Sequence, residues 1–160
     1  MKLHLLRHAK TQAIQPAKTD FERRLLPKGE EQARLIGNYL NDRLSRKITV
    51  FCSSSARTRQ TAKIVQQYFE FRDIRFEQKL YLADRNALLD FIWNLEHNDD
   101  VLLIGHNEGI SELASYFTDS YIGLQTAGYV CIEFDVTSWK ETSTGLGRLV
   151  DAFRPDVTTS

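Results

Sequence analysis

The 160-residue chain is long enough for one domain with its own core, and 42% of its residues are hydrophobic. The 21 Lys and Arg residues balance the 21 Asp and Glu residues, so the zero formal charge does not favour a nucleic-acid partner. No apolar run is long enough for a membrane span or a signal peptide. We therefore expect residues 1–160 to form a single domain of a soluble, cytoplasmic protein.

The first half of the chain alternates short apolar runs with stretches of helical periodicity. Residues 2–7 and 48–52 predict strands, the second of them rich in β-branched side chains. The polar stretch 9–27 is long enough to be a functional loop. Helices are predicted from residues 29 and 56 by apolar side chains three or four positions apart, namely Ala33, Ile36, Leu40 and Leu44 in the first and Ala62, Val65 and Phe69 in the second.

The second half of the chain continues this alternation and then changes character. Residues 74–76 predict a short strand, and the wholly apolar run 101–105 predicts a strand in the middle of a parallel sheet. Residues 129–136 and 148–153 predict two closing strands, which would form an antiparallel edge. Two further helices are predicted by Leu88, Ile92 and Leu95, and by Ile110, Leu113, Ala114 and Phe117. The fold class is therefore α/β with a mostly parallel, mixed sheet.

Arginine and histidine side chains follow three of the predicted strands. Arg7 and His8 end the first strand, Arg57 follows the second after residues 53–55, and His106 follows the strand 101–105. Because ligands of such sheets bind beyond the carboxyl ends of the strands, we expect these side chains to converge. Guanidinium groups suit phosphate oxygens, and a neutral imidazole is a competent nucleophile. Spacing alone does not separate this phosphate site from ordinary polar residues at strand ends.

The remaining histidines and the cysteines do not predict a metal site. On a strand, His4 and His8 would lie about 13 Å apart, too far to share one zinc ion. His4 is interpreted as a core residue and His97 as a loop residue after a helix. Cys52 and Cys131 stand far apart in apolar runs and are expected to be buried, reduced thiols.

Four blocks of the sequence resemble the histidine phosphatase superfamily, and in particular its SixA-like phosphohistidine phosphatases. They occur in the family's order and are Leu5-Leu6-Arg7-His8-Ala9-Lys10-Thr11, then Asp20 to Leu25 with Gly29, then Ser53 to Ala62, and finally Gly105-His106-Asn107-Glu108-Gly109. Thr126-Ala127, Glu133-Phe134-Asp135 and Trp139 are similar to the family's closing strands. The resemblance thus covers almost the whole chain.

This resemblance implies a three-layer α/β/α sandwich and a phosphatase that needs no metal or organic cofactor. His8 would be phosphorylated transiently, and water would then release phosphate. Arg7, Arg57 and His106 would form the phosphate pocket, which Arg23 could reach from the long loop.

Departures from the family pattern bear on the substrate. Ala9 replaces the commoner glycine, and Arg24 stands where proline is usual. Asp84 and Glu77 are candidates for a carboxylic general acid, but no block identifies either one, and Asp84 also suits the N-cap of a helix. Because an alkoxide leaves poorly without a proton, a pocket without an obvious acid favours phosphohistidine on a protein partner.

Three other functions stay open at this stage. One is a phosphomonoesterase for a small metabolite or nucleotide, with Asp84 or Glu77 as the acid. Another is a catalytically silent phosphate-binding module, although His8, Arg7, Arg57 and His106 are all present. A mutase would need a second phosphate pocket, for which no candidate segment is visible.

Overall fold

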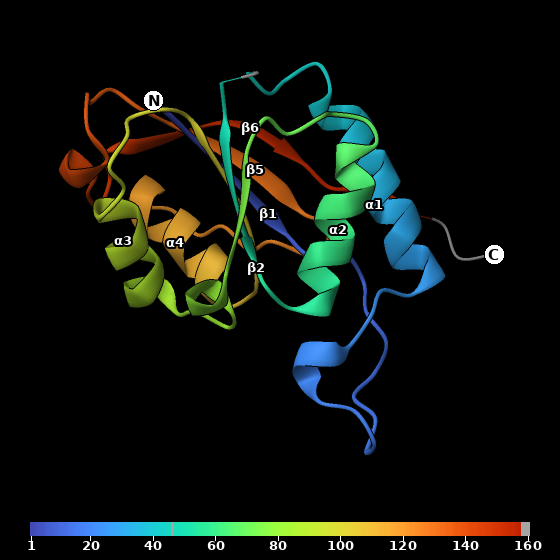
Figure 1. Cartoon of the computed structure of the whole chain (residues 1–160). Helices are drawn as coiled ribbons and strands as arrows, with labels where there is room; N and C mark the ends of the chain where they lie inside the picture. The colour runs from blue at the N-terminus through green and yellow to red at the C-terminus, as the bar shows by residue number, and fades with distance from the viewer. Residues whose placement is uncertain (46, 158–160) are drawn as a thin grey trace.

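The computed structural model describes residues 1–45 and 47–157 and arranges them in three layers, with one sheet between two pairs of helices (Figure 1). Helices α1 (Pro27–Leu40) and α2 (Ala56–Gln66) cover one face of the sheet. Helices α3 (Arg85–Trp93) and α4 (Gly109–Thr118) cover the other. The predicted α/β/α sandwich is confirmed.

The sheet has six strands in the order β3-β2-β4-β1-β5-β6. The strands are β1 (Lys2–Arg7), β2 (Thr49–Ser53), β3 (Ile74–Glu77), β4 (Val101–Gly105), β5 (Tyr129–Phe134) and β6 (Gly147–Phe153). Strands β3, β2, β4 and β1 are parallel, and β5 runs antiparallel to both β1 and β6. The sheet is therefore mixed and mostly parallel, as predicted, and β5 is the one of these strands that runs against the rest.

Side chains of the central strand β4 explain why the sheet needs helices on both faces. All five residues of β4 are buried. Since successive side chains of a strand point to opposite faces, Leu103 packs in the cluster under α3 and α4, while Leu102 and Ile104 pack under α1 and α2. The continuous apolar run of β4 follows from this burial on both sides.

The predicted helices extend too far at their C-terminal ends. α1 ends at Leu40 and α2 at Gln66, so Leu44 and Phe69 lie in the turns that follow, although both are buried in the same core. Leu95 likewise follows the end of α3 and packs against the other core cluster. Apolar residues in a connecting turn can cover a core as well as residues in a helix, so periodicity alone misplaces the helix end.

Residues between β1 and α1 form a loop that projects below the sheet in Figure 1 and carries the short 3-10 helix η1 (Asp20–Glu22). Its base is closed by a bridge between Thr11 and Leu25 and by a hydrogen bond from Gln12 N to Arg24 O of 2.9 Å. Two further 3-10 helices are η2 (Gln78–Leu80) and η3 (Trp139–Glu141).

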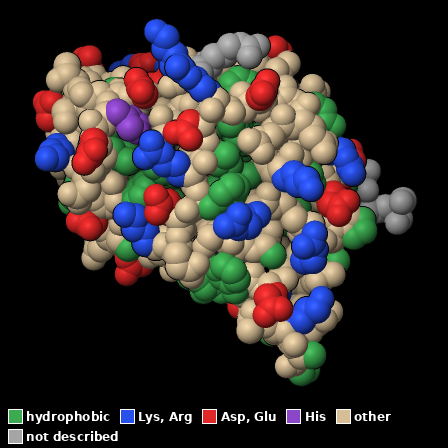
Figure 2. Space-filling model, in the orientation of Figure 1, with side chains coloured by type: hydrophobic (Ala, Val, Ile, Leu, Met, Phe, Trp, Pro, Cys, Tyr) green, Lys and Arg blue, Asp and Glu red, His purple; other side chains and the backbone are tan. Residues whose placement is uncertain are grey.

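The surface and the buried polar residues agree with the sequence predictions. Figure 2 shows positive and negative side chains interspersed over one face of the molecule, as the charge balance suggests. Cys52 and Cys131 are buried free thiols, and His4 is a core residue whose Nδ1 lies 2.7 Å from the Tyr129 hydroxyl. None of the described helices is long and apolar enough to cross a membrane.

Candidate active site

The structure brings together the arginines and histidines that follow three neighbouring strands. Arg7 ends β1 and His8 follows it, His106 follows β4, and Arg57 lies in the first turn of α2 after β2. Because β2, β4 and β1 are adjacent and parallel, their carboxyl ends meet at one edge of the sheet. The ring centroids of His8 and His106 are 5.4 Å apart. All four residues, together with Arg23, line one pocket of about 300 Å³.

Within residues 1–45 and 47–157, the His8 side chain uses one ring nitrogen in a hydrogen bond and leaves the other without a partner. The side chain is 7% exposed, and its Nδ1 lies 2.8 Å from the carbonyl oxygen of Ala9. A carbonyl only accepts hydrogen bonds, so Nδ1 carries the proton and Nε2 keeps its lone pair. Burial, followed by the positive charges of Arg57 and Arg7, lowers the pKa of His8 to about 4, although the Ala9 bond opposes this shift. His8 is therefore a neutral imidazole at neutral pH.

His106 is held in the opposite tautomer. Arg57 Nη2 lies 3.3 Å from His106 Nδ1 and can only donate, so Nδ1 accepts. His106 Nε2 then donates to Ser53 Oγ at 2.7 Å. Burial, together with the charge of Arg57, lowers the pKa of His106 to about 3. A bound phosphate dianion would favour the protonated ring, which could then donate to a phosphate oxygen.

Arg57 is anchored by the projecting loop. The side chain is 1% exposed, and it donates from Nη1 to Asp20 O at 2.8 Å and from Nη2 to Asp20 Oδ2 at 3.0 Å. Asp20 also pairs with Arg23 at 2.9 Å and accepts a hydrogen bond from the Tyr81 hydroxyl. Burial raises the pKa of the Asp20 carboxyl, but the Tyr81 bond and the charges of Arg57 and Arg23 outweigh it and leave the pKa below its usual value.

The two other arginines approach the pocket from different elements. Arg23 comes from the loop and donates to Gln12 O at 3.1 Å as well as to Asp20. Arg7 donates from Nη1 to Leu124 O at 3.0 Å. The Nε atoms of Arg7 and Arg57 are buried without a hydrogen-bond partner in the described parts of the chain. The pocket thus combines three guanidinium groups with two imidazoles, an arrangement that suits a tetrahedral oxyanion.

Neither candidate general acid is among the residues that line this pocket, and Asp84 lines the groove that adjoins it at Asn107. Asp84 is the N-cap of α3, and its Oδ1 accepts from Ala87 N at 2.8 Å. Its alternative interpretation as a helix cap is confirmed. Glu77 ends β3, which lies at the edge of the sheet, and lines a separate groove. Asp20 is the acidic residue among those that line the pocket.

Sequence reasoning missed three polar residues of the site. Asp20 and Ser53 fall within the blocks that resemble the histidine phosphatases, so each could have been proposed from its place in a block. Tyr81 lies in none of these blocks, and its hydrogen bond to Asp20 joins residues 61 positions apart, so the sequence offered no reason to propose it. In addition, no group of three or more His, Cys, Asp and Glu side chains that could hold a metal ion occurs in the residues described.

A pocket with two histidines and three arginines, at the carboxyl ends of the parallel strands of an α/β/α sandwich, is the arrangement expected of the histidine phosphatases. The family model described as "Histidine phosphatase superfamily (branch 1)" matches residues 3–87, and the chain belongs to this superfamily. An uncharacterised protein of Mycobacterium leprae is 28% identical over 135 residues, which are 81% of each chain. An uncharacterised protein of Mycobacterium tuberculosis (strain CDC 1551 / Oshkosh) is 32% identical over 110 residues, 68% of this chain and 67% of the relative.

Solved structures share the fold over nearly the whole chain. SixA from Agrobacterium tumefaciens superimposes with a TM-score of 0.80 at 26% identity, covering 96% of this chain and 97% of that one. The protein histidine phosphatase SixA complexed with tungstate gives a TM-score of 0.80 at 18% identity with the same coverage. A mycobacterial glucosyl-3-phosphoglycerate phosphatase gives 0.66 at 14% identity, covering 98% and 99%. Since the fold accommodates both kinds of phosphatase, the fold alone does not define the substrate.

Proposed function

We propose that this protein removes the phosphoryl group from phosphohistidine on a protein partner, through a transient phosphohistidine at His8. The observation that carries this proposal is the state of His8, a buried neutral imidazole whose Nδ1 proton is bonded to Ala9 O and whose Nε2 is free. Arg7, Arg57 and His106 line the same pocket and would bind the phosphate. We also propose that residues 1–160 form one domain, and that it acts in the cytoplasm, which its buried free thiols support.

In the first step, Nε2 of His8 attacks phosphorus, and the bond from phosphorus to the substrate imidazole breaks. If the other nitrogen of that imidazole carries a proton, the group leaves as neutral imidazole and takes no proton from the enzyme. His8 keeps the proton on Nδ1, where it donates a hydrogen bond to the Ala9 carbonyl, so the phosphorylated ring is a cation. That positive charge makes His8 a good leaving group in the next step.

In the second step, water attacks phosphorus, and the bond to His8 breaks with its electron pair returning to Nε2. The protons of the attacking water leave with inorganic phosphate, and His8 regains its neutral tautomer. In both steps negative charge spreads over the three equatorial oxygens of phosphorus. Arg7 and Arg57 would neutralise it with fixed guanidinium donors, and His106 would add a third donor once the anion favours its protonation.

The state of the carboxylate in the pocket supports phosphohistidine over alkyl phosphates. Asp20 lines the pocket, but its lowered pKa and its bonds from Arg57, Arg23 and Tyr81 keep it ionised. An ionised carboxylate cannot protonate an alkoxide, whereas a protonated imidazole leaves without help. A protein histidine phosphatase has been solved with tungstate, an oxyanion, and its likeness in fold is the reason to test a phosphohistidine substrate first.

Turnover of two substrates tests the proposal. We expect the enzyme to hydrolyse a phosphohistidine peptide at least about tenfold faster, in kcat/KM, than an aliphatic phosphomonoester, since only the ester needs an acid. Faster hydrolysis of the ester would overturn the preference and favour a small-molecule phosphatase. Binding of phosphate without turnover of either substrate would favour the silent binding module.

A further inference from the structure

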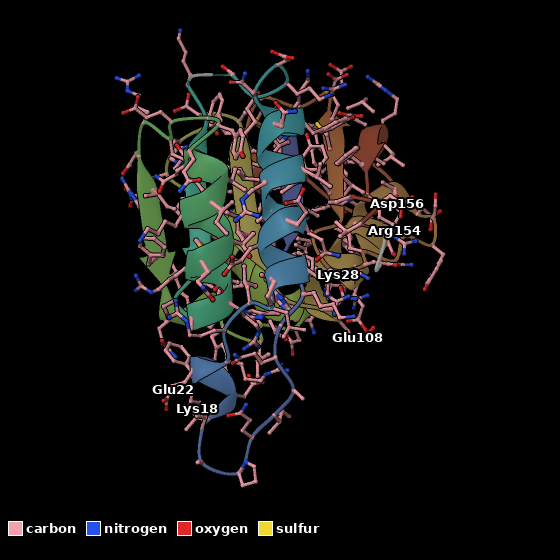
Figure 3. The ribbon with its side chains drawn as sticks, turned by 90° about the vertical axis from the view of Figure 1, so that its right-hand side faces the viewer. Lys18, Glu22, Lys28, Glu108, Arg154 and Asp156 are labelled. Carbon is pink, nitrogen blue, oxygen red and sulfur yellow. The ribbon has the colours of Figure 1, made fainter. Side chains whose placement is uncertain are left out.

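A second pocket adjoins the candidate active site. It has a volume of about 220 Å³ and is lined by three cations from separate parts of the chain, Lys10, Lys28 and Arg154. Lys10 and Thr126 line both this cationic pocket and the catalytic pocket, so the two pockets are neighbours. Figure 3 shows Lys28 at the lower end of α1 and Arg154 on the same side of the molecule.

The wall between the two pockets is built from buried, hydrogen-bonded groups. Gln32, which is buried, accepts from Lys10 N at 2.9 Å and donates to Thr126 Oγ1 at 3.4 Å. The carbonyl of Lys10 accepts from Leu26 N at 3.0 Å. It also packs so closely on α1 that a Cβ added at Gly29 would lie 2.1 Å from it. The chain therefore holds Lys10 beside the first turn of α1, which carries Lys28.

Among the described residues that line it, the cationic pocket carries more positive than negative charge. Asp156 is its acidic lining residue, against three cations. No ion pair within 4.0 Å in the described parts of the chain involves Lys10, Lys28 or Arg154. Lys10 and Arg154 are exposed, so a ligand in solvent can reach them. The positive end of the α1 dipole adds to the same field.

Another groove that adjoins the catalytic pocket has the opposite net charge. It shares Asn107 with the catalytic pocket, and its lining combines Asp84, Glu108, Glu112 and Asp119 with one cation, Arg85. An anionic group attached to a bound substrate would be repelled there and attracted to the cationic pocket.

We propose that the cationic pocket is a subsite for a second anionic group of the substrate, beside the phosphoryl group that is transferred. On the protein substrate of the proposed function, on which this inference rests, that group is the carboxylate of an acidic residue flanking the phosphohistidine. Lys28 and Arg154 bind it, and Lys10 lies between it and the phosphate.

Two matched peptides test the subsite. Both carry phosphohistidine, one with flanking Glu residues and the other with Gln in their place, and the readout is the ratio of their kcat/KM values. Wild-type enzyme is expected to favour the acidic peptide, and the double variant Lys28→Glu/Arg154→Glu to lower the ratio by about tenfold. Neither residue lines the catalytic pocket, so hydrolysis of free phosphoimidazole is expected to be unchanged.

The control variant is Lys140→Glu, which makes the same kind of charge reversal in η3. The indole of its neighbour Trp139 donates a hydrogen bond to Asp99 O. Because Asp99 precedes β4, Lys140 lies near the start of that strand, whereas the site lies beyond its carboxyl end. This variant is expected to keep the wild-type ratio. A glutamate at position 28 also suits the first turn of α1, so folding is expected to persist, and thermal unfolding checks it.

An unchanged ratio in the folded double variant, or an equal fall in the control, would overturn the subsite. Failure of the proposed function looks different, because the wild type would then hydrolyse phenyl phosphate but neither peptide. In that event the same variants are compared on phenyl phosphate and 4-carboxyphenyl phosphate. A loss of kcat/KM in the double variant that is confined to the carboxylated ester supports the subsite. An equal change in kcat/KM for both esters rejects it.

Discussion

Three buried histidines are expected to make this protein sensitive to mild acid. Burial lowers the pKa of His4 and His8 to about 4 and that of His106 to about 3, from an ordinary value of 6.5. All three side chains are nearly inaccessible in the folded protein, at 2%, 7% and 3% exposure. In the unfolded chain each ring would take up a proton as the pH falls below about 6.5.

The sign and size of the effect follow from proton linkage. A group with a lowered folded pKa binds fewer protons in the folded state, so the free energy of unfolding falls as the pH falls from about 6.5 toward the folded pKa. Each such histidine contributes a slope of about 1.4 kcal/mol per pH unit near pH 5, and the three together about 4 kcal/mol per pH unit. Above about pH 8 these histidines contribute almost no slope, because their rings are neutral in the unfolded chain as well.

Urea unfolding between about pH 7 and pH 5 measures this slope, and His4→Gln provides the test variant. His4 lies outside the catalytic pocket, and an amide can replace its hydrogen bond to the Tyr129 hydroxyl. We expect the variant to lose about a third of the wild-type slope, about 1.4 kcal/mol per pH unit, and to keep its activity. A wild-type slope below about 1 kcal/mol per pH unit, or parallel profiles for both proteins, would refute the reasoning.

Three substitutions test the site and its support. His8→Asn is expected to lower turnover by about a thousandfold or more and to abolish the labelled phosphoenzyme, since no nucleophile remains; a surviving adduct would contradict this. Arg57→Lys is expected to lower kcat about a hundredfold, because lysine keeps the charge but not the guanidinium fork; a loss below about tenfold would argue against the role of Arg57. Gly29→Ala is expected to cost about 1–3 kcal/mol in urea unfolding, because its Cβ would lie 2.1 Å from Lys10 O, and a change near zero would contradict the close packing.

Local sequence patterns were sufficient to predict the strands and to group four residues of the site. The run 101–105 is apolar at every position because β4 is buried on both faces, and such a run can be recognised without neighbours. Arg7, His8, Arg57 and His106 could be grouped because each follows a strand, and parallel strands end at the same edge of a sheet. The predicted C-terminal ends of the first two helices were wrong, because Leu44 and Phe69 lie in turns although their side chains are buried in the core.

Other properties of the site depend on contacts between distant segments. Periodicity, which arises from neighbouring residues, was enough to predict an α/β fold with histidines and arginines at one edge of the sheet, and the family resemblance implied the sandwich. The lowered pKa of His8, the ion pair of Asp20 with Arg57 and the cationic pocket around Lys28 could not be read in this way. The size of a pKa shift and the pairing of distant charges arise only when the folded chain excludes water and brings separate segments within a few ångströms, so no local pattern predicts them.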